Sequence, residues 1–137
     1  MSAFTREIVV RFEHCDPAGL MFYPRFFALV NEMVEDWFAA MGASFSAMHV
    51  DGRKGVPTVK LDAEFGRPAR MGDRLKQALK VTKIGAASCE LAHEASVDGH
   101  VVARFAQTIV FVSLDGMAPE SWPAPLRLQM ARYAEVK

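Results

Sequence analysis

The chain has 137 residues, a length that suits one domain around one hydrophobic core, and we expect a single domain over residues 1–137. Lys plus Arg and Asp plus Glu both number 16, and this balance excludes a global field that would hold nucleic acid or an anionic membrane. No apolar run reaches the roughly 18 residues of a membrane span and the start lacks an export-signal pattern, which predicts a cytoplasmic protein. In that compartment Cys15 and Cys89 are expected to stay free thiols.

The first predicted element is a strand over residues 5–13. Ile8, Val10 and Phe12 alternate with other side chains, which is the period of a strand with one strongly apolar face. The strand leads into the stretch EHCDPAGLMFYPRFF, residues 13–27, where an acid, a thiol, an imidazole and four aromatic residues stand close together.

A helix is predicted from Pro24 to Met41. At 100° per residue its polar side chains form one narrow stripe and apolar side chains fill the rest, so the helix must be buried on most sides. Pro24 suits the first helical turn, and Gly42 can supply the left-handed residue that ends the helix. The polar stripe consists of Asn31, Glu32, Glu35 and Asp36.

Four further strands are predicted after a polar connection at DGRKG. They cover residues 57–65, 73–84, 87–97 and 100–113, with Gly-, Pro- and Ser-containing breaks between them. Asp98 and Gly99 indicate a tight hairpin, and successive hairpins predict an antiparallel sheet. A short amphipathic tail is predicted to be helical after Pro125.

Five strands and one very apolar helix predict an α+β architecture in which the sheet curls around the helix. Such a sheet leaves an edge and a face incompletely covered. The segment VVARFAQTIVFV, residues 101–112, carries apolar residues on both faces and therefore indicates subunit contacts.

The order of three motifs resembles the 4-hydroxybenzoyl-CoA thioesterase family of hot-dog-fold enzymes, and the resemblance covers nearly the whole chain. CDPAG followed by YP ahead of the buried helix is the specific signal, whereas RPARMGD and IGAAS are weak alone but stand in the expected order. The resemblance implies a hot-dog fold, a homodimer whose sheets join edge to edge, and dimers that pair into tetramers. It also implies active sites at the subunit interface and CoA thioesters as substrates. Because nothing in the sequence provides a metal or nucleotide site, we expect no cofactor.

Asp16 and the backbone N–H of Tyr23 are the predicted catalytic groups. Thioester hydrolysis needs a nucleophile or base at the carbonyl carbon and donors for the oxyanion, and a helix start presents unpaired N–H groups. Gly19 lets the chain fold back between the two. In the family this aspartate acts as a nucleophile or as a general base on water, and both roles stay open. The competing interpretation makes Asp16 a loop cap.

Other catalytic arrangements are disfavoured by spacing. His14 and Cys15 are neighbours in an extended segment and should point to opposite sides, so they cannot pair as base and thiol. The four histidines show no metal-ligand spacing, and we expect no metal. Glu32 and Glu35 are the alternative carboxylates, since some hot-dog thioesterases carry the acid on the helix, but a solvated or interface stripe is favoured.

Substrate contacts are predicted from local chemistry. Phe22, Tyr23 and Phe26 could line a flat pocket for a benzoyl ring, although aromatic residues at a strand-helix junction are more often core. In a neutral chain the CoA phosphates require local basic residues, and Thr58 and Ser88 could bond the pantetheine arm or acyl group. The basic candidates are Arg67, Arg70, Lys83 and Arg104.

The resemblance therefore implies an acyl-CoA thioesterase, and CDPAG followed by FYP is more similar to the aromatic-acyl members of the family than to the short-chain aliphatic ones. A thioesterase for short or medium aliphatic acyl-CoA is the enzymatic alternative, and a non-catalytic acyl-CoA-binding hot-dog module is the alternative outside enzymes. A hydratase is disfavoured because no Asp is followed by a His a few residues later in a recognisable motif.

Overall fold

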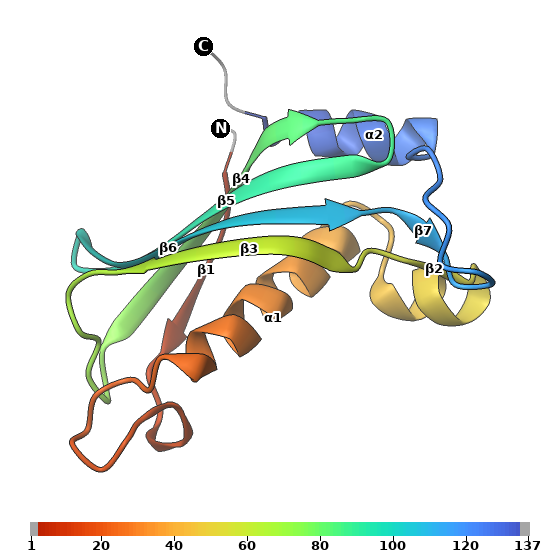
Figure 1. Ribbon diagram of the computed structural model, residues 1–137. Coiled ribbons are helices and arrows are strands. Elements are labelled where there is room, and N and C mark those ends of the chain that lie inside the picture. Colours follow the sequence, from red (N-terminus) through yellow and green to blue (C-terminus); the bar gives the residue numbers. More distant parts are fainter. Residues whose placement is uncertain (1–2, 135–137) are drawn as a thin grey trace.

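The computed structural model describes residues 3–134, so residues 1–2 and 135–137 of the expected domain lie outside the described part. One curved antiparallel sheet of five strands, in the order β1-β4-β5-β6-β3, dominates the fold (Figure 1). Its strands are β1 (Phe4–Val9), β3 (Thr58–Phe65), β4 (Arg74–Ile84), β5 (Ser88–Val97) and β6 (His100–Val110). This is the α+β hot-dog architecture that the sequence predicted.

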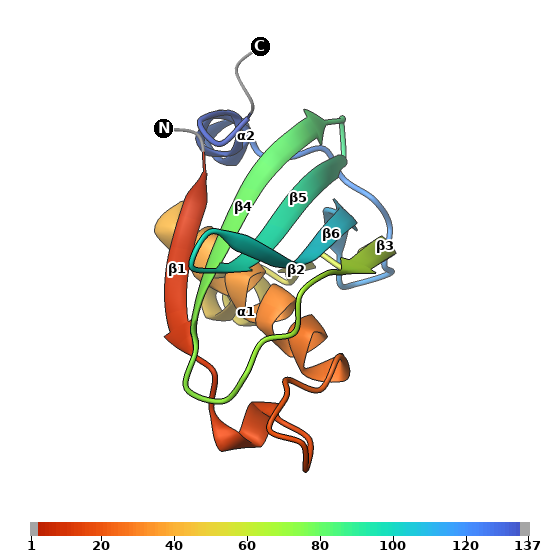
Figure 2. The same ribbon diagram turned by 90° about the vertical axis from the view of Figure 1, so that its left-hand side faces the viewer.

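The helix α1 (Pro24–Ala40) lies in the hollow of the sheet, and Figure 2 shows the strands arching over it. Pro24 stands in its first turn, and Gly42, with φ of 84°, follows its end in the left-handed region, both as predicted. A second helix, α2 (Ala124–Ala131), packs beside the end of β4. The buried side chains of α1 are Phe26, Leu29, Val30, Met33, Val34, Trp37 and Phe38.

The first strand is shorter than predicted. It ends at Val9, which pairs with Arg74, the first residue of β4, so no partner strand remains for the residues beyond. Val10 is still buried, but a 3₁₀ turn, η1 (Phe12–His14), follows, and Phe12 is 81% exposed. The predicted apolar face therefore does not extend to Phe12.

The hairpin prediction holds for β4 to β5 and for β5 to β6 but not for β3 to β4. Asp98 and Gly99 both have positive φ, 50° and 79°, as a tight two-residue hairpin turn requires. β3 instead pairs with β6, and residues 66–73 cross the end of the sheet to β4. β3 is thus an edge strand, while β6 is paired on both sides and can offer a partner only its outer face.

The sequence reading missed a small second sheet. The expected polar connection contains β2 (Lys54–Gly55), which pairs with β7 (Val112–Ser113), directly after β6. A π-helical turn, η2 (Ser46–Asp51), precedes β2. These short elements lie beyond the carboxyl end of α1 (Figure 1). Over residues 3–134, neither helix has the length and apolar character needed to cross a membrane.

Candidate active site

Asp16 closes the loop that precedes α1. Its backbone N–H donates to Leu20 O at 2.9 Å, and its Oδ1 accepts from the N–H groups of Ala18 at 2.9 Å and Leu20 at 3.3 Å. The carboxylate therefore does cap the loop, as the competing interpretation held. Within the described residues, however, Oδ2 has no hydrogen-bond partner, so half of the carboxylate stays available to a ligand.

The backbone holds Asp16 and the start of α1 in one small hairpin. Cys15 and Met21 form an isolated antiparallel β-bridge, and the Phe22 N–H donates to His14 O at 2.8 Å. Tyr23 is the cap residue of α1, and among residues 3–134 its N–H meets no acceptor. The next residue is Pro24, which has no N–H, so the Tyr23 N–H is the first donor of this helix start.

Gly19 allows the turn-back, as predicted. Its φ of 77° lies in the left-handed region, and its N–H donates to Asp16 O at 2.9 Å. The loop also contacts the crossing segment 66–73. The Met71 N–H donates to Gly19 O at 3.0 Å, and Leu20 and Arg70 form an isolated antiparallel β-bridge. The Asp16 loop and Arg70 are thus neighbours in the fold.

Arg67 and Arg70 share a cavity of about 440 Å³ between the crossing segment and the β5–β6 hairpin. His100 and Val102 line its other side. The side chain of Asp73 also lines this cavity and accepts the Arg70 backbone N–H at 2.8 Å. This contact does not involve the guanidinium groups of Arg67 and Arg70, which supply the basic charge of the cavity. These two of the predicted phosphate-binding residues lie on the same side of the molecule as Asp16.

Lys83 and Ser88 are not brought to Asp16 in the same chain. They stand at the far end of β4 and the start of β5, whereas β4 begins at Arg74 beside the Asp16 loop. At ~3.3 Å per residue along β4, about 30 Å separates these two residues from the Asp16 loop. Arg104 faces away from α1 and pairs with Glu94 at 3.1 Å. A single chain therefore assembles only part of the predicted substrate site.

Aromatic side chains surround the helix start. Phe22 and Tyr23 are 47% and 58% exposed with ring centroids 5.6 Å apart, and Tyr23 also contacts Phe65 of β3 at 6.1 Å. Phe26 is only 5% exposed and packs on Phe65 and Phe105, so it belongs to the core and not to an open pocket. Phe65 was missed because nothing in a strand sequence shows which strand becomes the edge.

Thr58 opens β3, at the other end of the strand from Phe65. Its Oγ1 accepts from Gln107 Nε2 at 2.8 Å, and Gln107 Oε1 lies 2.8 Å from His93 Nε2. Burial lowers the pKa of His93, although its hydrogen bond to Gln107 opposes that shift. The sequence reading overlooked both buried polar residues, yet a His and a Gln at core positions of otherwise apolar strands were a visible signal.

His14 and Cys15 do not form a base and thiol pair. His14 lies in the 3₁₀ turn, not in an extended segment, and its Nδ1 accepts the Arg11 N–H at 2.9 Å. Cys15 and Cys89 are both free, and burial raises the pKa of Cys89 to about 12. Within residues 3–134 no three His, Cys, Asp or Glu side chains gather where they could hold a metal ion.

The alternative carboxylates on α1 are engaged elsewhere. Glu32 and Asp36 pair with Arg6 of β1 at 3.2 Å and 3.0 Å, and Arg6 also donates to Gln77 at 2.7 Å. Glu35 accepts from Asn31 at 3.0 Å. The polar stripe thus ties α1 to the β1 side of the sheet.

The comparison with known families decides the class of this protein. The model of the thioesterase-like superfamily matches residues 10–130, which covers the Asp16 loop, α1 and all strands after β1. The chain belongs to the thioesterase-like superfamily. It is 29% identical over 130 residues to the 1,4-dihydroxy-2-naphthoyl-CoA hydrolase of Synechococcus elongatus, with 94% of each chain covered.

Solved structures agree with this membership. A 1,4-dihydroxy-2-naphthoyl-CoA thioesterase from Synechocystis superposes with a TM-score of 0.86 at 25% identity, over 94% of this chain and 96% of that one. A gentisyl-coenzyme A thioesterase has the same fold, with a TM-score of 0.82 at 21% identity over 93% and 99% of the two chains. The superfamily member described here is therefore a hot-dog thioester hydrolase.

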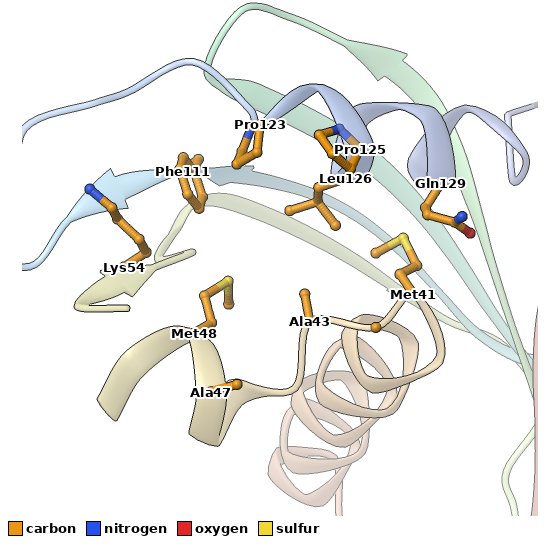
Figure 3. A pocket seen from close by; sticks show the side chains of 11 residues that line it. Met41, Ala43, Ala47, Met48, Lys54, Phe111, Pro123, Pro125, Leu126 and Gln129 are labelled. Atoms are coloured by element: carbon orange, nitrogen blue, oxygen red, sulfur yellow. The ribbon is translucent and has the colours of Figure 1, made fainter. Parts of the chain in front are cut away.

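This thioesterase has a further cavity of about 440 Å³ at the opposite end of α1 from Asp16 (Figure 3). Met41, Met48, Phe111 and Leu126 give it apolar walls. Lys54 stands at its side but pairs with Glu120 at 2.7 Å, so its charge is already balanced. Its lining includes no carboxylate, histidine or thiol that could attack a thioester, so this cavity does not compete with the Asp16 loop as the candidate active site.

Proposed function

We propose that this protein hydrolyses the CoA thioester of an aromatic acid, with Asp16 as nucleophile or general base and the Tyr23 N–H as oxyanion donor. The observation that carries the proposal is the Asp16 loop, which leads into the start of α1 and in which Oδ1 is fixed by two backbone N–H groups while Oδ2 has no partner among residues 3–134. A carboxylate held on one oxygen can present the other in a defined direction.

The chemistry follows from those two groups. As a nucleophile, Asp16 Oδ2 attacks the thioester carbonyl carbon, the carbonyl oxygen gains negative charge opposite the Tyr23 N–H, and CoA leaves as a thiolate that takes up a proton. Water then hydrolyses the Asp16 anhydride and restores the carboxylate. As a general base, Asp16 instead takes a proton from water, which attacks the same carbon directly. Both routes yield a free acid and CoA.

The edge of the sheet supports a dimeric site. β3 is an edge strand of the sheet that residues 3–134 form, and it exposes Val59, Leu61 and Phe65, a row that an isolated chain would leave to solvent. A twofold axis through the middle of β3 would extend the sheet and bring the Thr58 end of one copy to the Phe65 and Tyr23 end of the other. The substrate would then bind between two chains, and the pairing of dimers into tetramers stays a prediction.

Exposed aromatic rings favour an aromatic acyl group. Phe22 and Tyr23 flank the helix start with half of their surface open, and flat rings pack well against a flat acyl group. The relatives named above act on 1,4-dihydroxy-2-naphthoyl-CoA and gentisyl-CoA, both aromatic thioesters. Aliphatic acyl-CoA remains the second candidate because the same groups would cleave any thioester that reaches them.

A panel of acyl-CoA substrates tests the proposal, with release of free CoA thiol as the signal. Benzoyl, hydroxybenzoyl and hydroxynaphthoyl thioesters should give a higher kcat/KM than acetyl, butyryl and octanoyl thioesters. A clear preference for the aliphatic set would overturn the aromatic assignment. Binding of the panel without any thiol release would instead make the protein a non-catalytic acyl-CoA-binding module.

A further inference from the structure

A line of hydrogen bonds leads from the buried face of the sheet to its β3 edge. His93 Nε2 lies 2.8 Å from Gln107 Oε1, and Gln107 Nε2 lies 2.8 Å from Thr58 Oγ1. His93 and Gln107 are 5% and 6% exposed, whereas Thr58 is exposed. Buried polar side chains are costly unless they are satisfied, and here each satisfies the next in a line that ends at the surface.

The atoms fix the direction of this line. Gln107 Oε1 can only accept, so the His93 ring must carry its hydrogen on Nε2. The Gln107 amide then turns its NH₂ group toward Thr58, whose oxygen accepts. The hydroxyl hydrogen of Thr58 is left for a further acceptor. Burial, which lowers the pKa of His93, agrees with a neutral ring that carries a single N–H.

We propose that His93 and Gln107 are positioning residues that hold the Thr58 hydroxyl as a hydrogen-bond donor to an oxygen of the bound acyl-CoA. This rests on the proposed function, because the β3 pairing of two copies is what brings Thr58 to the other copy's helix start. His93 acts by fixing the orientation of the Gln107 amide through its Nε2–H. Without that N–H the Gln107 amide can turn over, and its oxygen then accepts the Thr58 hydrogen and removes the donor.

Two oxygens of the ligand have the required chemistry, an amide carbonyl of the pantetheine arm and a hydroxyl of the acyl ring. They give different results. If the contact is to the arm, its loss in Thr58→Val weakens inhibition by free CoA and raises KM for every thioester in the panel. If the contact is to the ring hydroxyl, its loss raises KM for hydroxybenzoyl-CoA and leaves KM for benzoyl-CoA unchanged. Either pattern supports the proposal and identifies the acceptor.

Steady-state kinetics of substitutions provide the test. Thr58→Val keeps the shape but removes the hydroxyl, and it should raise KM about three- to tenfold with kcat little changed, the range that one neutral hydrogen bond allows. Thr58→Ser should restore KM. His93→Phe should raise KM similarly, yet add nothing in the Thr58→Val background, because it acts only through that hydroxyl. Where the wild type binds acyl-CoA without hydrolysing it, Kd replaces KM.

Gln77→Leu is the matched control, since Gln77 is equally buried at 6% but donates to Leu29 O and not toward Thr58. It should destabilise the fold without raising KM. Nitrogen-15 NMR of the histidine rings measures the tautomer of His93 without an activity assay. The His93 ring should carry its hydrogen on Nε2. A hydrogen on Nδ1 alone, an unchanged KM in Thr58→Val, or equal effects of His93→Phe in both backgrounds would overturn the proposal.

Discussion

At the scale of single residues, Asp16 is a loop cap, and the catalytic role proposed for it is compatible with the capping that sequence reasoning treated as its alternative. One carboxylate oxygen caps the loop through Ala18 and Leu20, and the other has no partner within residues 3–134. Capping would support the proposed catalysis, because it limits the rotation of the side chain whose other oxygen would attack. The motif in the sequence could identify the residue. Which carboxylate oxygen accepts the loop N–H groups and which is left without a partner depends on loop geometry.

His93 should make stability depend on pH. Its pKa is lowered in the folded chain, mainly by burial, from an ordinary value of 6.5, so below that pH the unfolded chain binds the proton more readily. The free energy of unfolding should then fall as pH drops below about 6.5, by at most about 1.4 kcal/mol for each pH unit from this group. Urea unfolding at pH 7.5 and 5.5 measures the loss.

His93→Phe serves as the comparison for this pH effect. The variant keeps a ring of similar size in the same place, beside Phe105, but cannot bind a proton. Its free energy of unfolding should fall less between the two pH values than that of the wild type. Equal losses in both proteins would mean that His93 does not titrate differently in the folded and unfolded chains.

At the scale of elements, the sequence predicted α1 well and the sheet edges poorly. The helix follows from local signals, namely Pro24 at its start, Gly42 after its end and apolar residues on most sides between them. Strand order depends on contacts between distant segments. The segment 101–112 was expected at a subunit contact because both of its faces are apolar, yet β6 lies between β5 and β3. Pairing on both sides leaves only its outer face for the expected subunit contact, which stays a prediction.

The β3 edge should determine assembly. Leu61→Glu places a charge on the exposed edge strand, where two copies of the chain would repel, and should convert a dimer or larger assembly to the 15.2 kDa monomer in light scattering. Thioesterase activity should be lost with it, because each proposed site needs two chains. Circular dichroism should show that the fold persists.

Thr5→Lys is the control for that change. It adds a charge at an exposed position of β1, the opposite edge of the same sheet, and should alter neither mass nor activity. A fully active monomer of Leu61→Glu would contradict the shared site. So would a wild-type protein that is monomeric and active at micromolar concentration.

At the scale of the whole molecule, the fold brings together only part of the predicted substrate site. Arg70 lies beside the Asp16 loop, and Arg67 shares a cavity with it, because segment 66–73 crosses the sheet end there, a crossing that no local pattern indicates. Lys83 and Ser88 lie at the other end of β4 and β5. Twofold pairing of two copies of the chain can bring residues of different copies next to one another. The hydrophobic periodicity of one chain does not predict such symmetry.

Hydrolysis should need no metal ion, since both proposed routes use only a carboxylate, a backbone N–H and water. Treatment with EDTA followed by gel filtration should leave the rate of acyl-CoA hydrolysis within about twofold of the untreated enzyme, a difference under 0.5 kcal/mol in the barrier. Added Mg²⁺ or Zn²⁺ should not raise it. A rate that falls with chelation and returns with one divalent ion would replace this mechanism by metal-assisted hydrolysis.

The most direct measurement of the central claim is turnover of the best acyl-CoA substrate by Asp16→Asn. Asparagine keeps an acceptor oxygen for the Ala18 and Leu20 N–H groups, so the loop should persist, with a melting temperature and a substrate Kd close to those of the wild type. It removes the charge needed for attack or for base catalysis, and kcat should fall by at least about 10²-fold. A folded Asp16→Asn enzyme with near wild-type kcat would contradict the account and redirect the search to Glu32 and Glu35.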